Sequence, residues 1–401
     1  MSAISIACLL AMGLWFSATA VQATLVDKWA LTEGSAAWLT MSVQLGFVIG
    51  ALLSALFNVA DIWEPRKVFA SGAFVGAVLN ALIPILDIGY GMVVVLRFGT
   101  GMSLAIVYPV AMKIIATWTV RERGLAIGML VGALTIGSAS PHLVRAFGGI
   151  ADWRLVPYTV SALAVAGSCL GWFAGKLGPH ASPSPKFEWR HMGRALGVRP
   201  LRLANFGYLG HMWELYAMWT WIPVFLAFSF RQSDTSFVTS EGSIASMAAF
   251  GAFAVIAIGG LGSLVAGRLA DSWGRTRTTI LSMFVSGTCA LVIGFFVGSH
   301  PAIVIAIALV WGMSIVADSA QFSASVSELA DKEYVGTQLT TQTAMGFLLT
   351  MVSIRLVPEW TNLVGWRWAF AFLAIGPAFG IWAMWRLKNS PDASRLAAGR
   401  G

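Results

Sequence analysis

Charged residues are scarce in this sequence. Asp, Glu, Lys and Arg together make up 11% of its 401 residues, whereas a soluble domain has about 25%. A surface with so few charges cannot mostly face water. Hydrophobic residues make up 57% of the chain, which excludes an ordinary soluble domain and predicts helices that cross a membrane.

Cysteine is also rare, and the positions of the cysteines indicate neither disulfide bonds nor metal binding. Cys8, Cys169 and Cys289 lie in apolar stretches without paired spacing, which argues against a disulfide framework and a metal site. The sequence has no phosphate-binding loop, nucleophile elbow or cluster of metal ligands, so we expect neither an enzyme nor an ATP-driven pump, and no cofactor. Residues 1–6 carry no basic side chain, which argues against a secretory signal peptide.

Long apolar runs fill most of the chain. Each run is long enough to cross a hydrocarbon core of about 30 Å at about 1.5 Å per residue. The twelve runs are 4–25, 36–57, 67–86, 91–117, 124–147, 153–176, 201–228, 242–266, 278–297, 302–326, 336–357 and 366–387. We therefore predict an all-α membrane protein with twelve transmembrane helices.

A short charged segment, 267–277, joins the eighth and ninth runs. It reads Gly-Arg-Leu-Ala-Asp-Ser-Trp-Gly-Arg-Thr-Arg, and its glycines and charges predict a tight turn at a membrane surface. An altered copy lies at 59–67, where Asp61 precedes the matching Asp271 by 210 residues. The second glycine and the arginine that follows it are replaced in the earlier copy.

The pattern G-x-L-A-D-x-x-G-R-x-R resembles the loop motif of the major facilitator superfamily of secondary transporters. In that family the loop lies on the cytoplasmic side after the second helix of each half, and it takes part in gating. Because the earlier copy is degraded, we do not expect both loops to gate equally. The gating residues that the resemblance implies are Asp61, Gly267, Asp271, Gly274, Arg275 and Arg277.

Further repeats extend this correspondence along the chain. Gly101-Met102-Ser103 recurs 211 residues later as Gly312-Met313-Ser314, and the Trp-Arg pair that opens the sixth run recurs at the start of the twelfth. These matches predict two parallel halves of six helices, the architecture of the superfamily. The expected division is a bundle at 1–176, a linker at 177–200, a bundle at 201–387 and a tail at 388–401.

Basic residues predict the orientation. If the linker and both termini are cytoplasmic, that side carries 19 Lys and Arg residues against 6 on the other, as cytoplasmic loops usually do. This explains the net charge of +8 without nucleic acid, and the family resemblance implies a bacterial inner (plasma) membrane. The basic part of the linker, 187–194, is either a short amphipathic surface helix or a loop.

Arg97 lies inside the fourth run, where an ionisable group is costly unless it is paired or faces water. Its R-F-x-x-G pattern resembles a fourth-helix motif that is associated with proton-coupled members of the superfamily. Arg97, Thr100, Gly101 and Tyr108 share one helical face. Arg97 is either a cavity-facing cation that binds an anionic group, or an arginine that bonds neighbouring carbonyls.

The seventh run places two ionisable groups near the membrane midplane. His211 and Glu214 share a face and should pair, while Trp213 and Tyr216 lie on the opposite face. A carboxylate there could bind a proton in one conformation and release it in the other; the alternative is a buried structural pair. We expect Trp213 and Trp219 to line a cavity.

Polar side chains form a stripe along the tenth run at steps of three and four residues. A stripe on a membrane helix faces a cavity or another helix rather than lipid. Asp318 is a second carboxylate candidate, for substrate contact or for a structural or gating role. The candidate residues of the tenth and eleventh runs are Trp311, Asp318, Gln321 and Gln342.

Two further runs supply candidates. In the fifth, His142 and Arg145 lie near the outer end, as mouth or binding residues; the family's antiporter pattern G-x-x-x-G-P is incomplete there because Ala133 follows the second glycine. In the first, Trp15 and Gln22 share a face, and an amide in lipid needs a partner.

These features predict a secondary transporter that moves a small organic solute by alternating access. Arg97, His211 and the amides favour proton-coupled uptake of an organic anion or zwitterion, whereas tryptophan and methionine in the expected cavity suit efflux of an amphipathic compound. A non-transporting receptor or scaffold is the alternative of another class, and it leaves the midplane charges unexplained. The expected partners are the solute, protons and the lipid bilayer, and the chain is expected to act as a monomer.

Overall fold

The computed structural model describes residues 2–86, 89–118, 123–181, 187–233 and 240–401, without the side chains of 60–61 and 123–125. This part of the chain is helical and contains no strand. The longer helices are α1 (Ser2–Met12), α4 (Glu33–Leu56), α6 (Pro65–Leu86), α7 (Tyr90–Leu104), α8 (Tyr108–Ala116), α9 (Arg123–Phe147), α10 (Leu155–Ala174), α12 (Arg199–Arg231), α13 (Glu241–Ala257), α14 (Gly259–Trp273), α15 (Arg275–Val292), α16 (Pro301–Ala317), α17 (Ser319–Leu329), α18 (Val335–Val364) and α19 (Ile375–Lys388). The predicted all-α class is confirmed.

Ten helical segments within the described ranges are long and apolar enough to cross a membrane. Two other helices are long enough but more polar: α12 has 33 residues and α18 has 30. The ten segments and these two helices correspond to the twelve predicted runs. The polarity of α12 and α18 indicates that they face protein rather than lipid over much of their length.

Several predicted runs are broken rather than continuous. The fourth run divides into α7 and α8 around residues 105–107, where the following Pro109 lacks an N–H group and disfavours helix before it. The tenth divides into α16 and α17 at Asp318, which lies 211 residues after Val107, the offset of the sequence repeat. The internal repeat therefore extends to the positions of these two breaks.

The first run is broken too. It comprises α1, a 3-10 turn at Gly13–Phe16, α2 (Ser17–Ala20) and α3 (Gln22–Trp29). Such a break leaves backbone carbonyls without their usual intrahelical donors, and in a membrane other protein groups must satisfy them.

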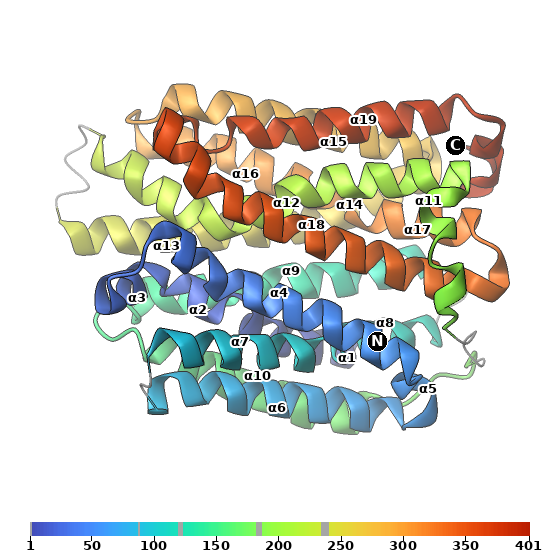
Figure 1. The fold of residues 1–401 in the computed structure, drawn as a ribbon, viewed down its shortest axis with the longest axis horizontal. Helices are drawn as coiled ribbons and strands as arrows, with labels where there is room; N and C mark the ends of the chain where they lie inside the picture. Colours follow the sequence, from blue (N-terminus) through green and yellow to red (C-terminus); the bar gives the residue numbers. More distant parts are fainter. Residues whose placement is uncertain (1, 87–88, 119–122, 182–186, 234–239) are drawn as a thin grey trace.

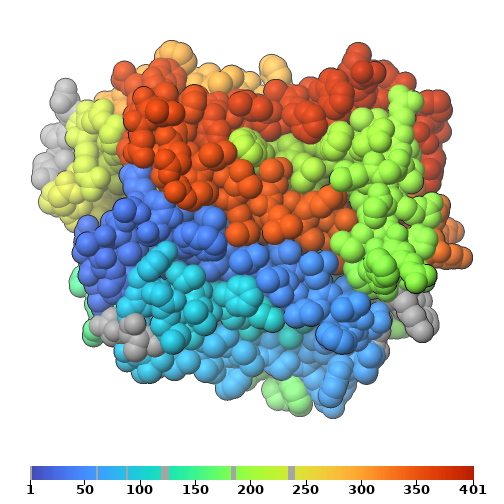
Figure 2. All heavy atoms as spheres, in the orientation of Figure 1, coloured from blue at the N-terminus to red at the C-terminus, as the bar shows by residue number. Residues whose placement is uncertain are grey.

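Figures 1 and 2 show the helices of the first part of the chain on one side of the molecule and those from α12 onward on the other. Across the boundary, α9 packs against α13 and α14, and α4 packs against α18. At the contact of α9 with α14, Gly132 faces Gly260. Helix α5 (Val59–Ile62), helix α11 (Arg194–Gly197) and the C-terminus lie at one end of the molecule, on the right in Figure 1.

Glycines allow very close helix crossings on each side of the boundary. A Cβ at Gly101 of α7 would overlap the carbonyl oxygen of Val43 of α4, and one at Gly312 of α16 would overlap that of Val255 of α13. The two glycines occupy equivalent places in the repeat. In membranes, such small residues let backbones approach and pack.

We predict that Gly101→Ala destabilises the protein, because the added methyl group overlaps main chain that cannot move aside. The expected loss is about 1–3 kcal/mol or more, seen as a Tm lowered by several degrees and a reduced monodisperse fraction after detergent extraction. Gly91→Ala is the matched control on the same helix, since a Cβ there meets nothing within 4 Å. Equal Tm values for the two variants would contradict this crossing.

Candidate functional site

Arg97 is fully buried and is held by the break in the first run. Its Nη1 donates to the Leu14 carbonyl at 2.7 Å and its Nη2 to the Trp15 carbonyl, while Nε donates to the Leu39 carbonyl of α4 at 3.3 Å. All three acceptors are main-chain oxygens. In this conformation the guanidinium supplies the donors that the broken helix lacks, which is the second of the two roles considered for it.

Asn80 of α6 supports the same arrangement and was not among the predicted site residues. Its Oδ1 accepts from Arg97 Nη1 at 3.4 Å, and its Nδ2 donates to the Pro157 carbonyl and to Ser161 Oγ of α10. Asn80 is fully buried. A lone amide in the apolar run 67–86 was the signal that could have identified it.

The carboxylate of Glu214 on α12 is buried and accepts two hydrogen bonds from neutral donors. Trp311 Nε1 of α16 donates at 2.7 Å, and Ser286 Oγ of α15 donates at 2.9 Å. The expected pairing of Glu214 with His211 is wrong. The two side chains share a helical face, but each bonds to other residues: Glu214 to Trp311 and Ser286, and His211 to Asp318.

His211 pairs instead with Asp318, at 2.8 Å between Nδ1 and Oδ1, and both side chains are buried. The break between α16 and α17 falls at Asp318. The Nε2 atom of His211 has no hydrogen-bond partner among the described residues. The buried polar groups of α12 therefore form two neighbouring clusters, one around each carboxylate.

The polar stripe of the tenth run divides at the same break. Trp311 and Asp318 face α12, whereas Gln321 of α17 accepts a hydrogen bond from Arg275 Nη1 at 2.7 Å. Gln342 of α18 is fully buried, and Ser323 Oγ of α17 lies 3.4 Å from its Oε1. Helix α17 thus connects the carboxylate region with the charged loop that contains Arg275.

Arg275 is the centre of that loop. It pairs with Glu328 of α17 at 2.8 Å and lies 3.7 Å from Asp271. Gly274 adopts a φ of +97°, which a side chain would disfavour. A Cβ at Gly267 would meet nothing within 4 Å, and Arg277 is exposed. Asp61 lies in α5, and its side chain is outside the described part of the structure.

The C-terminal residues cover this loop. The Thr276 N–H donates to the Gly401 carbonyl at 3.1 Å, the guanidinium of Arg400 donates to the Asp271 carbonyl, and the Ala397 N–H donates to Glu328 at 3.0 Å. The tail is therefore attached both to the loop that contains Arg275 and to α17, which contains Glu328.

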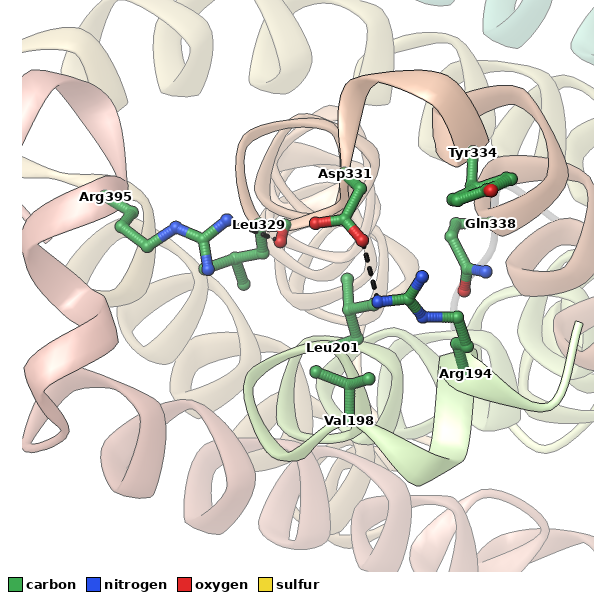
Figure 3. A pocket seen from close by; sticks show the side chains of 8 residues that line it. All are labelled: Arg194, Val198, Leu201, Leu329, Asp331, Tyr334, Gln338 and Arg395. Carbon is green, nitrogen blue, oxygen red and sulfur yellow. Dashed lines mark hydrogen bonds and ion pairs between the residues drawn. The ribbon is translucent and has the colours of Figure 1, made fainter. Parts of the chain in front are cut away.

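The basic linker contains two short helices, Trp189–His191 and Arg194–Gly197, within its described residues. Arg194 pairs with Asp331 at 2.7 Å, and the His191 ring stacks on Tyr334 at 3.9 Å between centroids. Figure 3 shows Arg194 pointing toward Asp331 at a cavity of about 70 Å³, with Arg395 on the other side. The linker and the tail meet around this cavity.

Between the two sides of the molecule, aromatic rings meet near the break of the first run. Trp15 lies 5.8 Å from Tyr216 and 5.3 Å from Phe347 between ring centroids, and Phe16 lies 5.8 Å from Trp219. Nearby, Thr350 Oγ1 and Gln44 Oε1 join α18 to α4 at 2.8 Å. This boundary places Tyr216 and Trp219 against the opposite half.

The remaining predicted residues are distributed around this boundary. His142 of α9 is fully buried beside Phe16, and neither ring nitrogen has a partner among the described residues. Gln22 is buried, and its Oε1 likewise has no partner there. Trp213 packs edge-on against Phe372, away from the first half, and Tyr108 begins α8 and is partly buried.

Comparison with known families identifies this arrangement. Residues 3–354 and 245–401 match the sequence model of the Major Facilitator Superfamily. The chain belongs to this superfamily. It is therefore a multi-pass membrane transporter rather than an enzyme, and the predicted twelve-helix architecture is confirmed.

Solved structures with the same fold include three transporters. The D-xylose-proton symporter has a TM-score of 0.73 at 16% identity, covering 98% of both chains. A bacterial homologue of the human lysosomal transporter Spinster, inward-facing and unoccupied, has a TM-score of 0.71 at 12% identity, covering 97% of this chain and 98% of that one. A mutant of the nucleoside transporter NupG has a TM-score of 0.70 at 15% identity, covering 96% of this chain and 99% of that one. At these identities the likeness shows the fold alone.

One curated relative shares part of the sequence. Probable anion transporter 6, chloroplastic, of Arabidopsis thaliana is 30% identical over 141 residues. The match covers 33% of this chain and 26% of that protein, so the chain matches only about a quarter of the relative's length.

We predict that Arg97→Lys lowers the Tm by several degrees, because an ammonium group cannot reproduce the fork of donors that the broken helix uses. Losing hydrogen bonds from a charged donor to buried carbonyls costs about 1.5–3 kcal/mol each. The matched control is Arg386→Lys, at an exposed arginine of α19. An unchanged Tm in Arg97→Lys would show that the guanidinium does not support the break.

A double-mutant cycle tests the loop contact. Arg275 and Glu328 are partly buried, with side chains 15% and 28% exposed, so we expect Arg275→Gln and Glu328→Gln each to lower the Tm. The stability lost in the double variant should be smaller than the sum of the losses in the two single variants, by a coupling free energy of about 1 kcal/mol. Arg231→Gln and Glu241→Gln, from an exposed ion pair, provide the control cycle. Strict additivity at the Arg275–Glu328 pair would mean that this contact stabilises nothing.

Proposed function

We propose that this protein moves a small organic anion across the bacterial inner membrane by alternating access, coupled to protons. The observation that carries the proposal is the pair of buried carboxylates, Glu214 and Asp318. Among the described residues, their side-chain partners are an indole N–H, a hydroxyl and an imidazole, and none of these carries a fixed positive charge. A permanently ionised carboxylate inside a membrane would be expected to pair with Lys or Arg.

Partners without a fixed positive charge leave each carboxylate free to gain or lose a proton as its surroundings change. The Trp311 and Ser286 donors stabilise an ionised Glu214, and separating them from it would favour the protonated form. Such separation needs only a small displacement of α12 relative to α15 and α16. Proton uptake and release would then accompany the conformational change.

We propose further that residues 1–176 and 201–387 act as the two moving bundles, with the linker 177–200 and both termini on the cytoplasmic side. The contacts of α9 with α13 and α14, and of α4 with α18, form the boundary that would open and close. The Arg275–Glu328 pair and the covering C-terminal residues lie at the cytoplasmic end in this orientation. They would favour one state of the cycle, in keeping with the gating role proposed for the loop.

An anionic cargo is favoured over a cationic one by donors at the boundary that have no partner in the described part of the chain, which include the indole N–H groups of Trp15 and Trp219. The partial likeness to a probable anion transporter supports the same class of cargo. Arg97 is not assigned to the cargo, since its donors are occupied by main-chain carbonyls.

Efflux of an amphipathic compound is the second candidate, and the aromatic boundary favours it. The two candidates differ in the charge of the cargo and in its direction of movement. Proteoliposomes with an imposed proton gradient can separate them: gradient-driven accumulation of a carboxylic acid from a panel of small mono- and dicarboxylates supports uptake of an anion, whereas movement of only uncharged or cationic amphipaths supports efflux.

We predict that Glu214→Gln abolishes gradient-driven accumulation while sparing exchange of cargo across the membrane. The amide keeps hydrogen bonding but cannot release a proton, so coupling is lost and alternating access is kept. Accumulation should fall at least tenfold, with counterflow within about threefold of the original protein; these are order-of-magnitude expectations for removing one proton carrier.

Glu359→Gln is the matched control, because Glu359 lies on α18 with its side chain 55% exposed and paired to Arg355. It should leave both activities unchanged. Equal loss of accumulation and exchange in Glu214→Gln would count against a coupling role for this carboxylate.

A further inference from the structure

Six aromatic rings form a cluster where the two halves meet, three from the first half and three from the second. Centroid distances across the boundary are 4.8 Å for Phe47–Phe347, 5.3 Å for Trp15–Phe347, 5.8 Å for Trp15–Tyr216 and for Phe16–Trp219, and 6.2 Å for Phe16–Tyr216. The Phe16 and Tyr216 rings are nearly parallel, at 10°. We call these six residues the ring cluster: Trp15, Phe16, Phe47, Tyr216, Trp219 and Phe347.

The ring cluster contains polar atoms that no described residue satisfies. The indole Nε1 atoms of Trp15 and Trp219 are buried and have no hydrogen-bond partner among the described residues, and the two residues are 3% and 1% exposed. An indole N–H can only donate. Leaving a buried donor unpaired costs about 1–3 kcal/mol, so two such donors in one place suggest a partner that arrives from outside.

His142 adds a third unsatisfied group at the edge of the ring cluster, 6.5 Å from Phe16 between ring centroids. Its two nitrogens are both without a partner in the described part of the chain. A neutral imidazole offers one donor and one acceptor, so it can also donate to a ligand.

The chemistry of the partner follows from these two properties. Flat aromatic faces favour a planar ring, since stacked or edge-on ring pairs add about 0.5–1.5 kcal/mol beyond the area they bury. Unpaired N–H groups favour an acceptor, and a carboxylate only accepts. A cationic amine would bring further donors and leave the indoles unpaired, and a sugar would lack the flat face.

We propose that the ring cluster is the binding site for a planar aromatic carboxylate, whose ring lies between the two sets of aromatic side chains and whose oxygens accept from the Trp15 and Trp219 N–H groups. This assignment rests on the proposed function, because it names the cargo of the same transporter. In the structure the rings of the two halves contact each other, so the ligand takes the place of these ring-to-ring contacts when the halves separate.

The test uses the full chain, purified in detergent, and four probes that differ in one property each. Benzoate carries the ring and the carboxylate, benzamide keeps the ring and is neutral, benzylamine keeps the ring and is cationic, and cyclohexanecarboxylate keeps the carboxylate without aromaticity. We expect benzoate at millimolar concentration to raise the Tm. We also expect equilibrium dialysis with the radiolabelled acid to detect its binding. The other three should bind at least about fivefold more weakly, which corresponds to the loss of one stacking or hydrogen-bonding contribution.

Two variants examine the donors. Trp219→Phe and Trp15→Phe each remove one N–H group and keep an aromatic ring, and each should weaken benzoate binding about tenfold, as expected for one hydrogen bond to a charged acceptor. Trp172→Phe is the matched control, at an exposed tryptophan of α10, and should change binding less than about twofold. Two independent variants keep the test informative if one of them folds poorly.

Each contrary outcome overturns the assignment. Tighter binding of benzylamine than of benzoate would mean a cation site, equal binding of cyclohexanecarboxylate would remove the role of stacking, and absence of benzoate binding to folded protein would reject the site altogether. Transport in proteoliposomes distinguishes failure of the ring-cluster assignment from failure of the proposed function. If a non-aromatic acid accumulates under the gradient and benzoate does not bind, only the ring-cluster assignment is wrong. Benzoate binding without any gradient-driven accumulation defeats the proposed function alone.

Discussion

The hydrogen bonds from Arg97 to the broken first run are the interaction on which the centre of the molecule depends. No water inside a bilayer can satisfy the carbonyls of a helix that stops being regular, so a protein donor has to do so. Arg97 reaches the carbonyls of Leu14 and Trp15 directly. Because these residues follow Gly13 in the break, the same contacts fix the positions from which Trp15 and Phe16 extend to the other half.

A second set of contacts links the other half from its centre to its surface. Asp318 terminates α16 beside His211, and the short helix α17 that follows carries Gln321 and Glu328 to Arg275. Asp318 and the partners of Arg275 therefore lie on one continuous segment of the chain. One helix of 11 residues thus connects the buried carboxylate with the surface loop.

Much of this organisation could be predicted from the sequence, because hydrophobic runs, repeats and ionisable residues in apolar surroundings are local signals. They indicated the helical class, the family and the buried positions of Arg97, Glu214 and Asp318. Partner choice could not be predicted in the same way. The spacing of His211 and Glu214 defines a shared face of α12, but which of α15, α16 or α17 lies opposite each one depends on packing across about 70–110 residues of sequence separation. The role of Asn80 depends likewise on contacts with α7 and α10.

The two glycine crossings within the halves are closer than the contact of the facing glycines at the boundary. At Gly101 and Gly312, the backbones of α4 and α7, and of α13 and α16, approach so closely that neither crossing has room for a side chain. At Gly132 and Gly260, by contrast, the nearest atoms that a Cβ on either residue would meet are the other's backbone atoms, at 3.2 Å or more. The helix pairs within each half are therefore tied together by their main chains, whereas α9 and α14 face each other at these glycines across a wider gap.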